Sequence, residues 1–305
     1  MNAELQIIHE GLMAPNAWLS PKFFYDETGS KLFEAITRLP EYYLTRTEKT
    51  IFEQARSALV DLIGTGPVMI DLGAGNCEKA EQLFKDLRPS HYVAIDVASD
   101  FLAATLNRIR ADYPALPVHQ VDGDFTHGLT LPADIPGDQR LVFFPGSTIG
   151  NFDPVAAAEL LREVARLAGP TGRCLIGIDL LKPTEILEAA YNDAQGITAE
   201  FNLNMLRVVN AVAKADFDLS QWKHRAFFNV AKKRIEMHLE STSDQWVHWC
   251  GGKRLFQRGE RIHTENSYKF TLAEFESLLQ KAGLSQRSVF TDEHRWFALV
   301  IAEPA

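Results

Sequence analysis

The segment at residues 68–76 constrains the fold of this chain more than any other. An apolar run ends on Asp71, and Gly73 and Gly75 follow it one residue apart. A helix-like pattern then occupies 78–87. A strand, a glycine turn and a helix in this order are typical of the first unit of an open α/β sheet, whose ligands bind beyond the carboxyl ends of the strands. Because glycine has no Cβ, the turn can bend sharply and a ligand can approach its backbone closely.

A second apolar strand, at 91–96, ends on Asp96, where such folds place a carboxylate that binds ribose hydroxyl groups. The pattern therefore predicts a cofactor that contains adenosine. A dinucleotide site would have a third glycine near position 78, but this sequence has Glu78, a carboxylate where the diphosphate would lie. This charge favours S-adenosylmethionine, which has a positive centre and no phosphate, over NAD or FAD. Asp71 is expected to hold the amino end of its methionine part.

Strands and helices continue to alternate up to about residue 196, which predicts an α/β fold with a doubly wound, Rossmann-like sheet. The continuous apolar runs among them are typical of buried parallel strands. The elements expected after Asp96 are helices at 101–113 and 154–168 and strands at 118–121, 140–144 and 174–180.

Two loops at the carboxyl edge of this sheet are candidate binding segments. Asp124 and Phe125 lie in an acid-rich loop that can contact an adenine ring, although Asp and Gly also form ordinary surface turns. Gly146 and Asn151 follow the next strand and are expected to border the cofactor and its acceptor. Asn151 offers a donor and an acceptor, but it could instead cap the helix at 154–168.

From about residue 197 the pattern changes to strands with polar residues at alternate positions, which is typical of half-exposed antiparallel sheets. We therefore predict two parts. The first is a cofactor-binding core at 60–196, completed by about 283–305. The second is an α+β substrate-binding lobe made of 1–59 and 197–282.

The N-terminal part gives three local expectations. Residues 1 to about 20 show little periodicity and are expected to be irregular. Ser30 is expected to cap a helix that runs through Ile36. Thr47 is expected to cap a second helix, which carries apolar residues at helical spacing.

Charge and cysteine content restrict the partners. Lys and Arg total 31 against 40 Asp and Glu, and both signs are interspersed, so the basic face that binds nucleic acid is not expected. The three cysteines are far apart and lack metal-ligand spacing, which indicates a reducing compartment and no metal site. No segment approaches the roughly eighteen apolar residues that span a bilayer, and no leader pattern is present. We expect a cytoplasmic monomer that binds no membrane.

Six further segments are more specific than the glycine turn. They are YDxxGSxLF from Tyr25, LPEYYxTRTE from Leu39, GSTIGN from Gly146, AYxDAxGxT from Ala190, IEM from Ile235 and TExSxKF from Thr264. Together they resemble the histidine Nα-methyltransferases of ergothioneine biosynthesis, and the resemblance covers nearly the whole chain. It implies that the protein adds three methyl groups from S-adenosylmethionine to the α-amino nitrogen of L-histidine and forms hercynine.

The resemblance also implies roles for individual positions. The positions that it implies for cofactor binding are Gly73, Lys79, Asp96, Asp124 and Phe125. The strand and turn pattern alone already predicts cofactor contacts for Asp71, Gly75 and Gly146. Tyr25 is expected to lie near the reacting amine as the catalytic residue. The residues implied for binding histidine are Tyr42, Asn151 and Tyr191 for its carboxylate, Met237 for the side-chain pocket, and Glu265 and Ser267 for the imidazole.

Glu265 and Ser267 carry the prediction of specificity for histidine. A carboxylate can accept from one imidazole N–H, and a hydroxyl can read the other ring nitrogen. A site built in this way rejects analogues that lack the ring N–H. Alternatively, the two residues are outward residues on one face of an exposed strand. Two other functions stay open, namely methylation of another amino acid or amine by the same fold, and binding of S-adenosylmethionine without catalysis.

Overall fold

The computed structural model describes residues 3–96, 99–123 and 128–305. The chain divides into two compact units. The first unit consists of Met1–Tyr43 and Lys182–Ser267, and the second consists of Leu44–Leu181 and Tyr268–Ala305. Each unit therefore contains two separate stretches of the chain.

The second unit is built on a seven-stranded sheet in the order β11-β12-β5-β4-β1-β2-β3. The neighbours from β5 to β3 pair in parallel, whereas β12 is antiparallel to β5 and to β11. Because β2 and β4 flank β1 on opposite sides, the strand order reverses at β1, where ligands bind in such sheets. The strands are β1 (Val68–Leu72), β2 (His91–Asp96), β3 (Val118–Asp122), β4 (Arg140–Phe144), β5 (Arg173–Asp179), β11 (Leu284–Thr291) and β12 (Phe297–Pro304).

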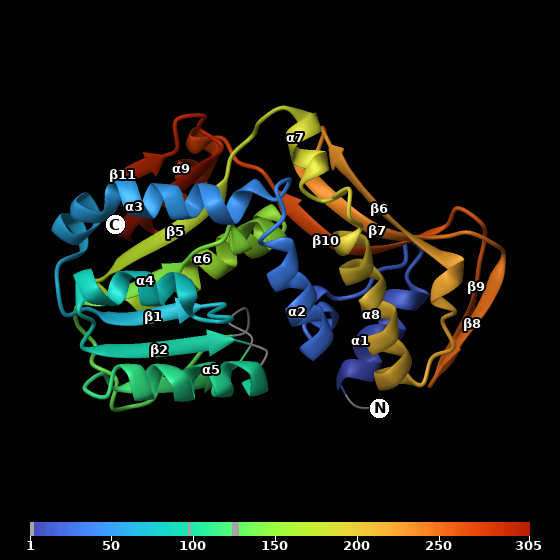
Figure 1. Cartoon of the computed structure of the whole chain (residues 1–305), viewed down its shortest axis with the longest axis horizontal. Helices are drawn as coiled ribbons and strands as arrows, with labels where there is room; N and C mark the ends of the chain where they lie inside the picture. Colours follow the sequence, from blue (N-terminus) through green and yellow to red (C-terminus); the bar gives the residue numbers. More distant parts are fainter. Residues whose placement is uncertain (1–2, 97–98, 124–127) are drawn as a thin grey trace. The chain divides into compact units, whose positions relative to one another are not determined.

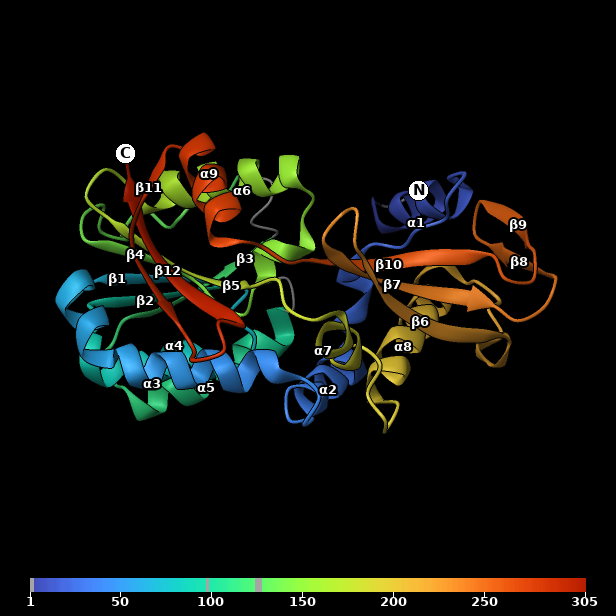
Figure 2. The same ribbon diagram turned by 90° about the horizontal axis from the view of Figure 1, so that it is seen from above.

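Helices cover both faces of this sheet, as Figures 1 and 2 show. Helices α3 (Tyr43–Ile63), α4 (Glu78–Leu87) and α5 (Ser99–Asp112) lie on one face. Helices α6 (Pro154–Ala168) and α9 (Leu272–Lys281) lie on the other face, above an apolar core of the central strands. Strand β1 is buried along its whole length, as expected for a central parallel strand. The predicted doubly wound fold is confirmed.

The first unit combines helices with antiparallel strands, as the alternating pattern predicts. Its three-stranded sheet has the order β10-β7-β6, and β8 and β9 form a separate hairpin. The rings of Phe24 and Phe201 stack with their centroids 4.5 Å apart. The elements are α1 (Ala3–Met13), η1 (Pro21–Phe24), α2 (Glu27–Ile36), α7 (Thr184–Ala189), α8 (Ile197–Ala213), η4 (Leu219–Gln221), β6 (Trp222–Asn229), β7 (Arg234–Ser241), β8 (Gln245–Trp249), β9 (Gly252–Phe256) and β10 (Arg261–Tyr268).

The unit boundaries differ from the expected ones at 59/60, 196/197 and 282/283. Most of α3 belongs to the second unit, where Phe52 packs against Phe143 of β4 with ring centroids 5.9 Å apart. Residues 182–196 belong to the first unit, and 268–282 belong to the second. Two of the observed boundaries lie within continuous elements, since 267/268 divides β10 and 43/44 follows the first residue of α3, so no loop marks them in the sequence.

Three local expectations in the N-terminal part are wrong. Residues 3–13 form helix α1, whose buried Ile8 and Leu12 lie one turn apart on the same side. Helix α2 is capped by Asp26, which accepts from the amide of Gly29 at 2.7 Å, so Ser30 lies inside the helix. Helix α3 begins at Tyr43, one turn before Thr47.

Candidate active site

The glycine turn after β1 has an open backbone. Gly73 and Gly75 have φ of +72° and +54°, a conformation that strains residues with a side chain. A Cβ at either position would meet no atom of residues 3–96, 99–123 and 128–305 within 4 Å, so these parts of the chain leave the space in front of both residues open. This segment can therefore receive a ligand in direct contact with its main chain. The geometry fits the predicted cofactor turn.

Asp96, at the end of β2, is tied to this turn. Its Oδ2 accepts a hydrogen bond from the amide of Gly75 at 2.8 Å. The bond holds the predicted ribose-binding carboxylate beside the glycines, although the two residues are 21 positions apart. Two residues predicted separately as cofactor residues are therefore in direct contact.

Asp71, at the carboxyl end of β1, is a buried carboxylate. Its Oδ2 accepts from the hydroxyl of Tyr92 at 2.7 Å, whereas its Oδ1 is buried and has no hydrogen-bond partner in the described part of the chain. Burial raises the pKa of Asp71 to about 7, in spite of the opposing hydrogen bond from Tyr92, and the charge of Asp96 raises it further. A buried oxygen that lacks a partner near an open turn suits a cationic group, and S-adenosylmethionine carries such groups.

Lys79, in the first turn of α4, and Gly146 both contact the side chain of Glu48. Glu48 is not among the predicted site residues. Glu48 of α3 accepts from the amide of Gly146 at 2.7 Å and pairs with Lys79 at 2.6 Å. Glu48 lies one turn from Leu44 and from Phe52, both buried, so it is a carboxylate within the apolar stripe of its helix. A charged residue at an apolar position of a helix is the sequence feature that could have identified Glu48 as a candidate site residue.

The first unit holds a series of aromatic residues that includes three predicted site residues. Tyr25 contacts Phe33 with ring centroids 5.9 Å apart, Phe33 contacts Tyr42 at 6.4 Å, and Tyr42 contacts Tyr191 at 6.3 Å. The hydroxyl of Tyr191 donates to Oγ of Ser267 at 2.8 Å. The structure thus brings Tyr42, Tyr191 and Ser267 together.

Glu265 and Met237 lie on neighbouring strands of the same unit. Met237 is buried on β7, and Glu265 is half-buried on β10. Nε2 of His263 lies 2.9 Å from Oδ1 of Asn266, whereas side chains three apart in a regular strand point to opposite faces. The alternation of β10 therefore shifts between these residues, next to Glu265. Ser267 is only 5% exposed, so the alternative of an outward residue is wrong for it.

The remaining predicted residues lie in the second unit. Asn151 is the last residue of the short helix η3 (Thr148–Asn151) after β4. It does not cap α6, because Asp153 does so by accepting from the amides of Val155 and Ala156. Asp124 and Phe125 lie outside the described residues.

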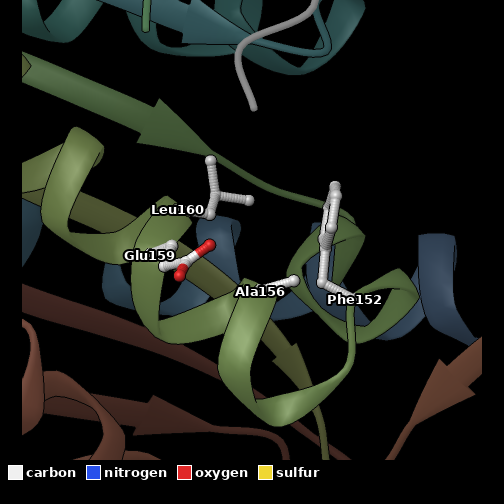
Figure 3. Close-up of a pocket in the computed structure, with 4 residues that line it drawn as sticks. All are labelled: Phe152, Ala156, Glu159 and Leu160. Atoms are coloured by element: carbon white, nitrogen blue, oxygen red, sulfur yellow. The ribbon is translucent and has the colours of Figure 1, made fainter. Parts of the chain in front are cut away.

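A small cavity of about 200 Å³ lies beside α6 in the second unit. Its lining is mostly apolar with one carboxylate, as Figure 3 shows, and consists of Phe152, Ala156, Glu159 and Leu160. None of these is a predicted site residue. The open glycine turn, rather than this cavity, therefore marks the candidate cofactor site.

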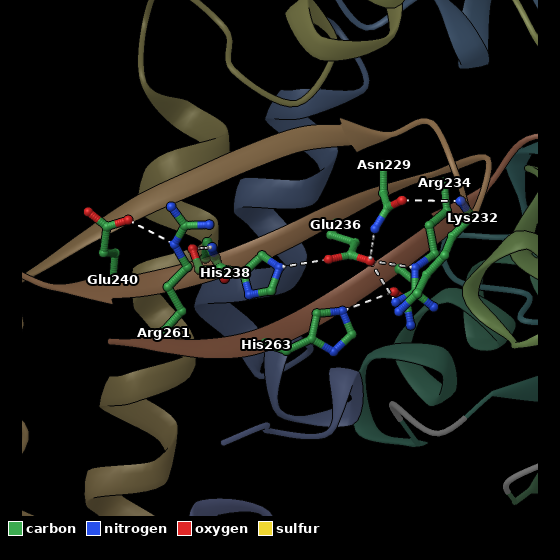
Figure 4. Close-up of polar contacts among 10 residues, drawn as sticks. Asn229, Lys232, Arg234, Glu236, His238, Glu240, Arg261 and His263 are labelled. Carbon is green, nitrogen blue, oxygen red and sulfur yellow. Dashed lines mark hydrogen bonds and ion pairs between the residues drawn. The ribbon is translucent and has the colours of Figure 1, made fainter. Parts of the chain in front are cut away.

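A polar cluster around Glu236 and His238 lies on β7 and β10 of the first unit and is drawn in Figure 4. Glu236 accepts from Asn229 at 3.0 Å and from Nε of Arg234 at 2.8 Å, and Nε2 of His238 lies 3.1 Å from its other oxygen. Burial raises the pKa of Glu236, but these hydrogen bonds outweigh burial and lower the pKa to about 2. Burial, and then the nearby His263, lower the pKa of His238 to about 4. The cluster contains no predicted site residue.

A doubly wound sheet with an open glycine turn and a buried carboxylate beside it defines the class of Rossmann-like, S-adenosylmethionine-dependent methyltransferases. The fold is similar to that of an S-adenosylmethionine-dependent methyltransferase from Clostridium acetobutylicum, with a TM-score of 0.50 and 11% sequence identity. The match covers 90% of this chain and 96% of the other. At this identity the likeness is evidence for the fold alone.

Residues 4–304 match the sequence profile of the histidine-specific, S-adenosylmethionine-dependent methyltransferases, and the chain belongs to that family. A histidine N-alpha-methyltransferase from Mycobacterium tuberculosis is 40% identical over 303 residues, which are 97% of this chain and 93% of the relative. Ergothioneine biosynthesis protein 1 from Neurospora crassa is 33% identical over 277 residues, which are 88% of this chain but 31% of that longer protein. The resemblance predicted from the six segments is confirmed.

Proposed function

We propose that this protein transfers three methyl groups, one after another, from S-adenosylmethionine to the α-amino nitrogen of L-histidine and forms hercynine. Membership of the histidine-specific family supports the substrate. The observation that carries the proposal is the buried hydrogen bond between Tyr191 and Ser267 beside Tyr42. Hydroxyl groups within aromatic surroundings suit a small molecule with a polar aromatic ring.

The cofactor residues lie around the turn after β1. Gly73 and Gly75 offer open main chain, and Asp96 is held beside them to accept from the ribose hydroxyl groups. Oδ1 of Asp71 can accept from the ammonium group of the methionine part, because no described residue donates to it. When bound, S-adenosylmethionine supplies a methyl group that its sulfonium centre has already activated.

The residues of this chain then have to position a neutral amine, which is mainly a matter of orientation and electrostatics. Tyrosine and asparagine can orient an amine and a carboxylate without adding a competing nucleophile. We assign the histidine carboxylate to Tyr42, Tyr191 and Asn151, and the vicinity of the amine to Tyr25. The one hydroxyl hydrogen of Tyr191 is donated to Ser267 in the free protein, so Tyr191 would donate to the carboxylate only after histidine binding redirects that hydrogen. Met237 is assigned to the side-chain pocket. These roles extend the family resemblance to the matching positions of this sequence.

Glu265 and Ser267 are assigned to the imidazole. A carboxylate can accept from the ring N–H, and a serine hydroxyl, which can both donate and accept, can contact the other ring nitrogen while it accepts from Tyr191. Reading both ring nitrogens distinguishes histidine from tryptophan, whose indole has no second ring nitrogen. The same pair therefore argues against another amino acid as the preferred acceptor.

Mass spectrometry tests the proposal. The purified protein is incubated with S-adenosylmethionine and equimolar L-histidine, L-tryptophan and L-tyrosine. We expect histidine with one, two and finally three added methyl groups, and no change in the other two. Methylation of another acceptor with histidine untouched would overturn the histidine assignment, and binding of both ligands without product would support a non-catalytic protein.

We also infer that the protein acts as a monomer in the cytoplasm. The free thiols of Cys77, Cys174 and Cys250 support a reducing compartment. Every helix in the described residues is too short or too polar to cross a lipid bilayer. Light scattering coupled to size exclusion, with an expected mass of 34.2 kDa, tests the oligomeric state.

A further inference from the structure

Glu48 is a buried carboxylate in the second unit. It lies in the second turn of α3, and its side chain is 1% exposed. A charged group in such a position is unfavourable unless hydrogen bonds and a counter-charge compensate it. The partners of Glu48 therefore indicate why a carboxylate occupies an apolar stripe.

Its two oxygens contact two different loops of the sheet edge. Oε1 accepts from the amide of Gly146, the second residue after β4, at 2.7 Å. Oε2 lies 2.6 Å from Nζ of Lys79, which follows the glycine turn of β1. One side chain thus joins the loops after β1 and β4, between which the strand order of the sheet reverses.

Two glycines leave room for this arrangement. A Cβ at Gly177 of β5 would lie 2.4 Å from Oε1 of Glu48, which is closer than any real contact. A Cβ at Gly146 would lie 2.9 Å from Nζ of Lys79, and Gly146 also has a φ of +77°. Larger residues at either position would push the carboxylate or the ammonium group away.

The two members of the ion pair differ in exposure. The side chain of Lys79 is 34% exposed, whereas that of Glu48 is 1% exposed. An ammonium group has three hydrogens to donate, so one contact with Glu48 leaves capacity for an anionic ligand group. The carboxylate holds the ammonium from the inside, and a ligand would approach Lys79 from the open side.

We propose that Glu48 is a positioning residue for the methyl donor, because it fixes the ammonium group of Lys79 and the main chain of Gly146 in one arrangement. The inference rests on the proposed function for its assignment of Lys79 and Gly146 to S-adenosylmethionine. The fixed ammonium binds the carboxylate of the methionine part. Without Glu48, Lys79 turns toward water and adds an uncompensated positive charge near a cationic ligand.

Calorimetric titration of the full chain with S-adenosylmethionine, in the absence of histidine, tests this role. The Glu48→Gln variant keeps an oxygen for the amide of Gly146 but removes the charge that holds Lys79. We expect affinity for S-adenosylmethionine to fall by about tenfold or more, the loss of one charge-assisted contact. The matched control is Glu53→Gln, an exposed residue of the same helix, which should stay within about twofold of the wild type.

A double-mutant cycle shows whether Glu48 acts through Lys79. In a Lys79→Gln background, Glu48→Gln should weaken affinity by less than about twofold further, since the two residues then act as one unit. In turnover assays, Glu48→Gln should raise KM for S-adenosylmethionine with KM for histidine within about twofold.

Three results would overturn the proposal. The first is an unchanged affinity for S-adenosylmethionine in a folded Glu48→Gln variant, and the second is fully additive effects in the double-mutant cycle. The third is an equal loss of affinity for S-adenosylmethionine and for histidine together with a lower Tm. Because the titration needs no methyl acceptor, a failure to methylate histidine would leave this test intact. Failure of the positioning role is thus distinguishable from failure of the proposed function.

Discussion

The hydroxyl of Tyr191 donates to Oγ of Ser267 across 2.8 Å, and the two residues are 76 positions apart in the chain. Both side chains are buried, at 7% and 5% exposure. The bond therefore connects the segment after α7 to the end of β10 and orients the hydroxyl group of Ser267. A serine fixed in this way presents a defined donor to its ligand.

We expect Tyr191→Phe to weaken histidine binding by about tenfold or more, because the variant removes the hydroxyl that orients Ser267 but keeps the aromatic ring. Titration with L-histidine at saturating S-adenosylmethionine measures the change. Tyr113→Phe, which removes the hydroxyl of a half-buried tyrosine in the second unit, serves as the matched control. Equal losses of affinity for histidine and for S-adenosylmethionine would contradict the assigned role.

Glu265 tests the recognition of the imidazole separately. Glu265→Ala should weaken the binding of histidine far more than the binding of S-adenosylmethionine, because the variant removes only the acceptor for the ring N–H. Glu265→Gln keeps an acceptor oxygen but not the charge, and it should retain part of the affinity. The measurement is the pair of dissociation constants for each variant. If both constants rise equally, Glu265 is not the imidazole ligand.

Asp71 couples cofactor binding to pH. Its pKa is raised to about 7 by burial, so the folded protein holds a proton there that the unfolded chain loses near pH 4. The folded state binds more protons in this interval, and its stability therefore falls as pH rises from about 4 to about 7. A cation placed beside Asp71 favours the ionised form and reverses the shift.

Binding of S-adenosylmethionine near pH 7 should therefore release about half a proton per molecule bound, because Asp71 is about half protonated at its pKa, and the affinity should increase by about tenfold between pH 6 and pH 8. Calorimetry in two buffers of different ionisation enthalpy measures the released proton directly. Asp71→Asn should bind more weakly and show no such dependence. An affinity of the wild-type protein that is constant from pH 6 to pH 8 would exclude Asp71 as the partner of the ammonium group.

The sequence predicted the second unit well because its signals are local. The first strand begins at Val68 as predicted and extends one residue beyond Asp71, and the helix at 78–87 has the predicted bounds, since an apolar run and a glycine turn define them without reference to distant residues. The contact between Gly75 and Asp96 follows from parallel pairing of β1 and β2, which places the ends of both strands at one edge.

The contacts that the sequence did not predict join segments that are distant in the chain. Glu48 and Gly146 are 98 positions apart, and no periodic pattern relates them. Lys269 is fully buried against Asp179 with Nζ 2.7 Å from Oδ2, although a lysine in a strand pattern is ordinarily an exposed residue. Such pairs are determined by the packing of the whole unit. In the sequence, only a charged residue on an otherwise apolar face indicates that a buried pair is present.

The cluster around His238 gives a prediction for stability against acid. His238 faces Glu236, His263 and Arg261, and stacks on Phe227 with ring centroids 5.4 Å apart. Its pKa is lowered to about 4, so below pH 6.5 the unfolded chain takes up a proton that the folded chain excludes. Stability should therefore fall as pH falls from about 6.5 to about 4, and this residue accounts for roughly 2 kcal/mol of the loss at pH 5.

The test compares unfolding by urea at pH 7.5 and pH 5 for the wild type and for His238→Gln, whose amide can still donate to Glu236. The variant should lose less stability between the two pH values than the wild type. His294→Gln, which removes an exposed histidine, is the matched control and should keep the wild-type difference. The pKa of Glu236 is about 2, so its titration lies below this interval and does not contribute to the comparison. If His238→Gln and the wild type lose equal stability, the cluster does not confer the acid sensitivity.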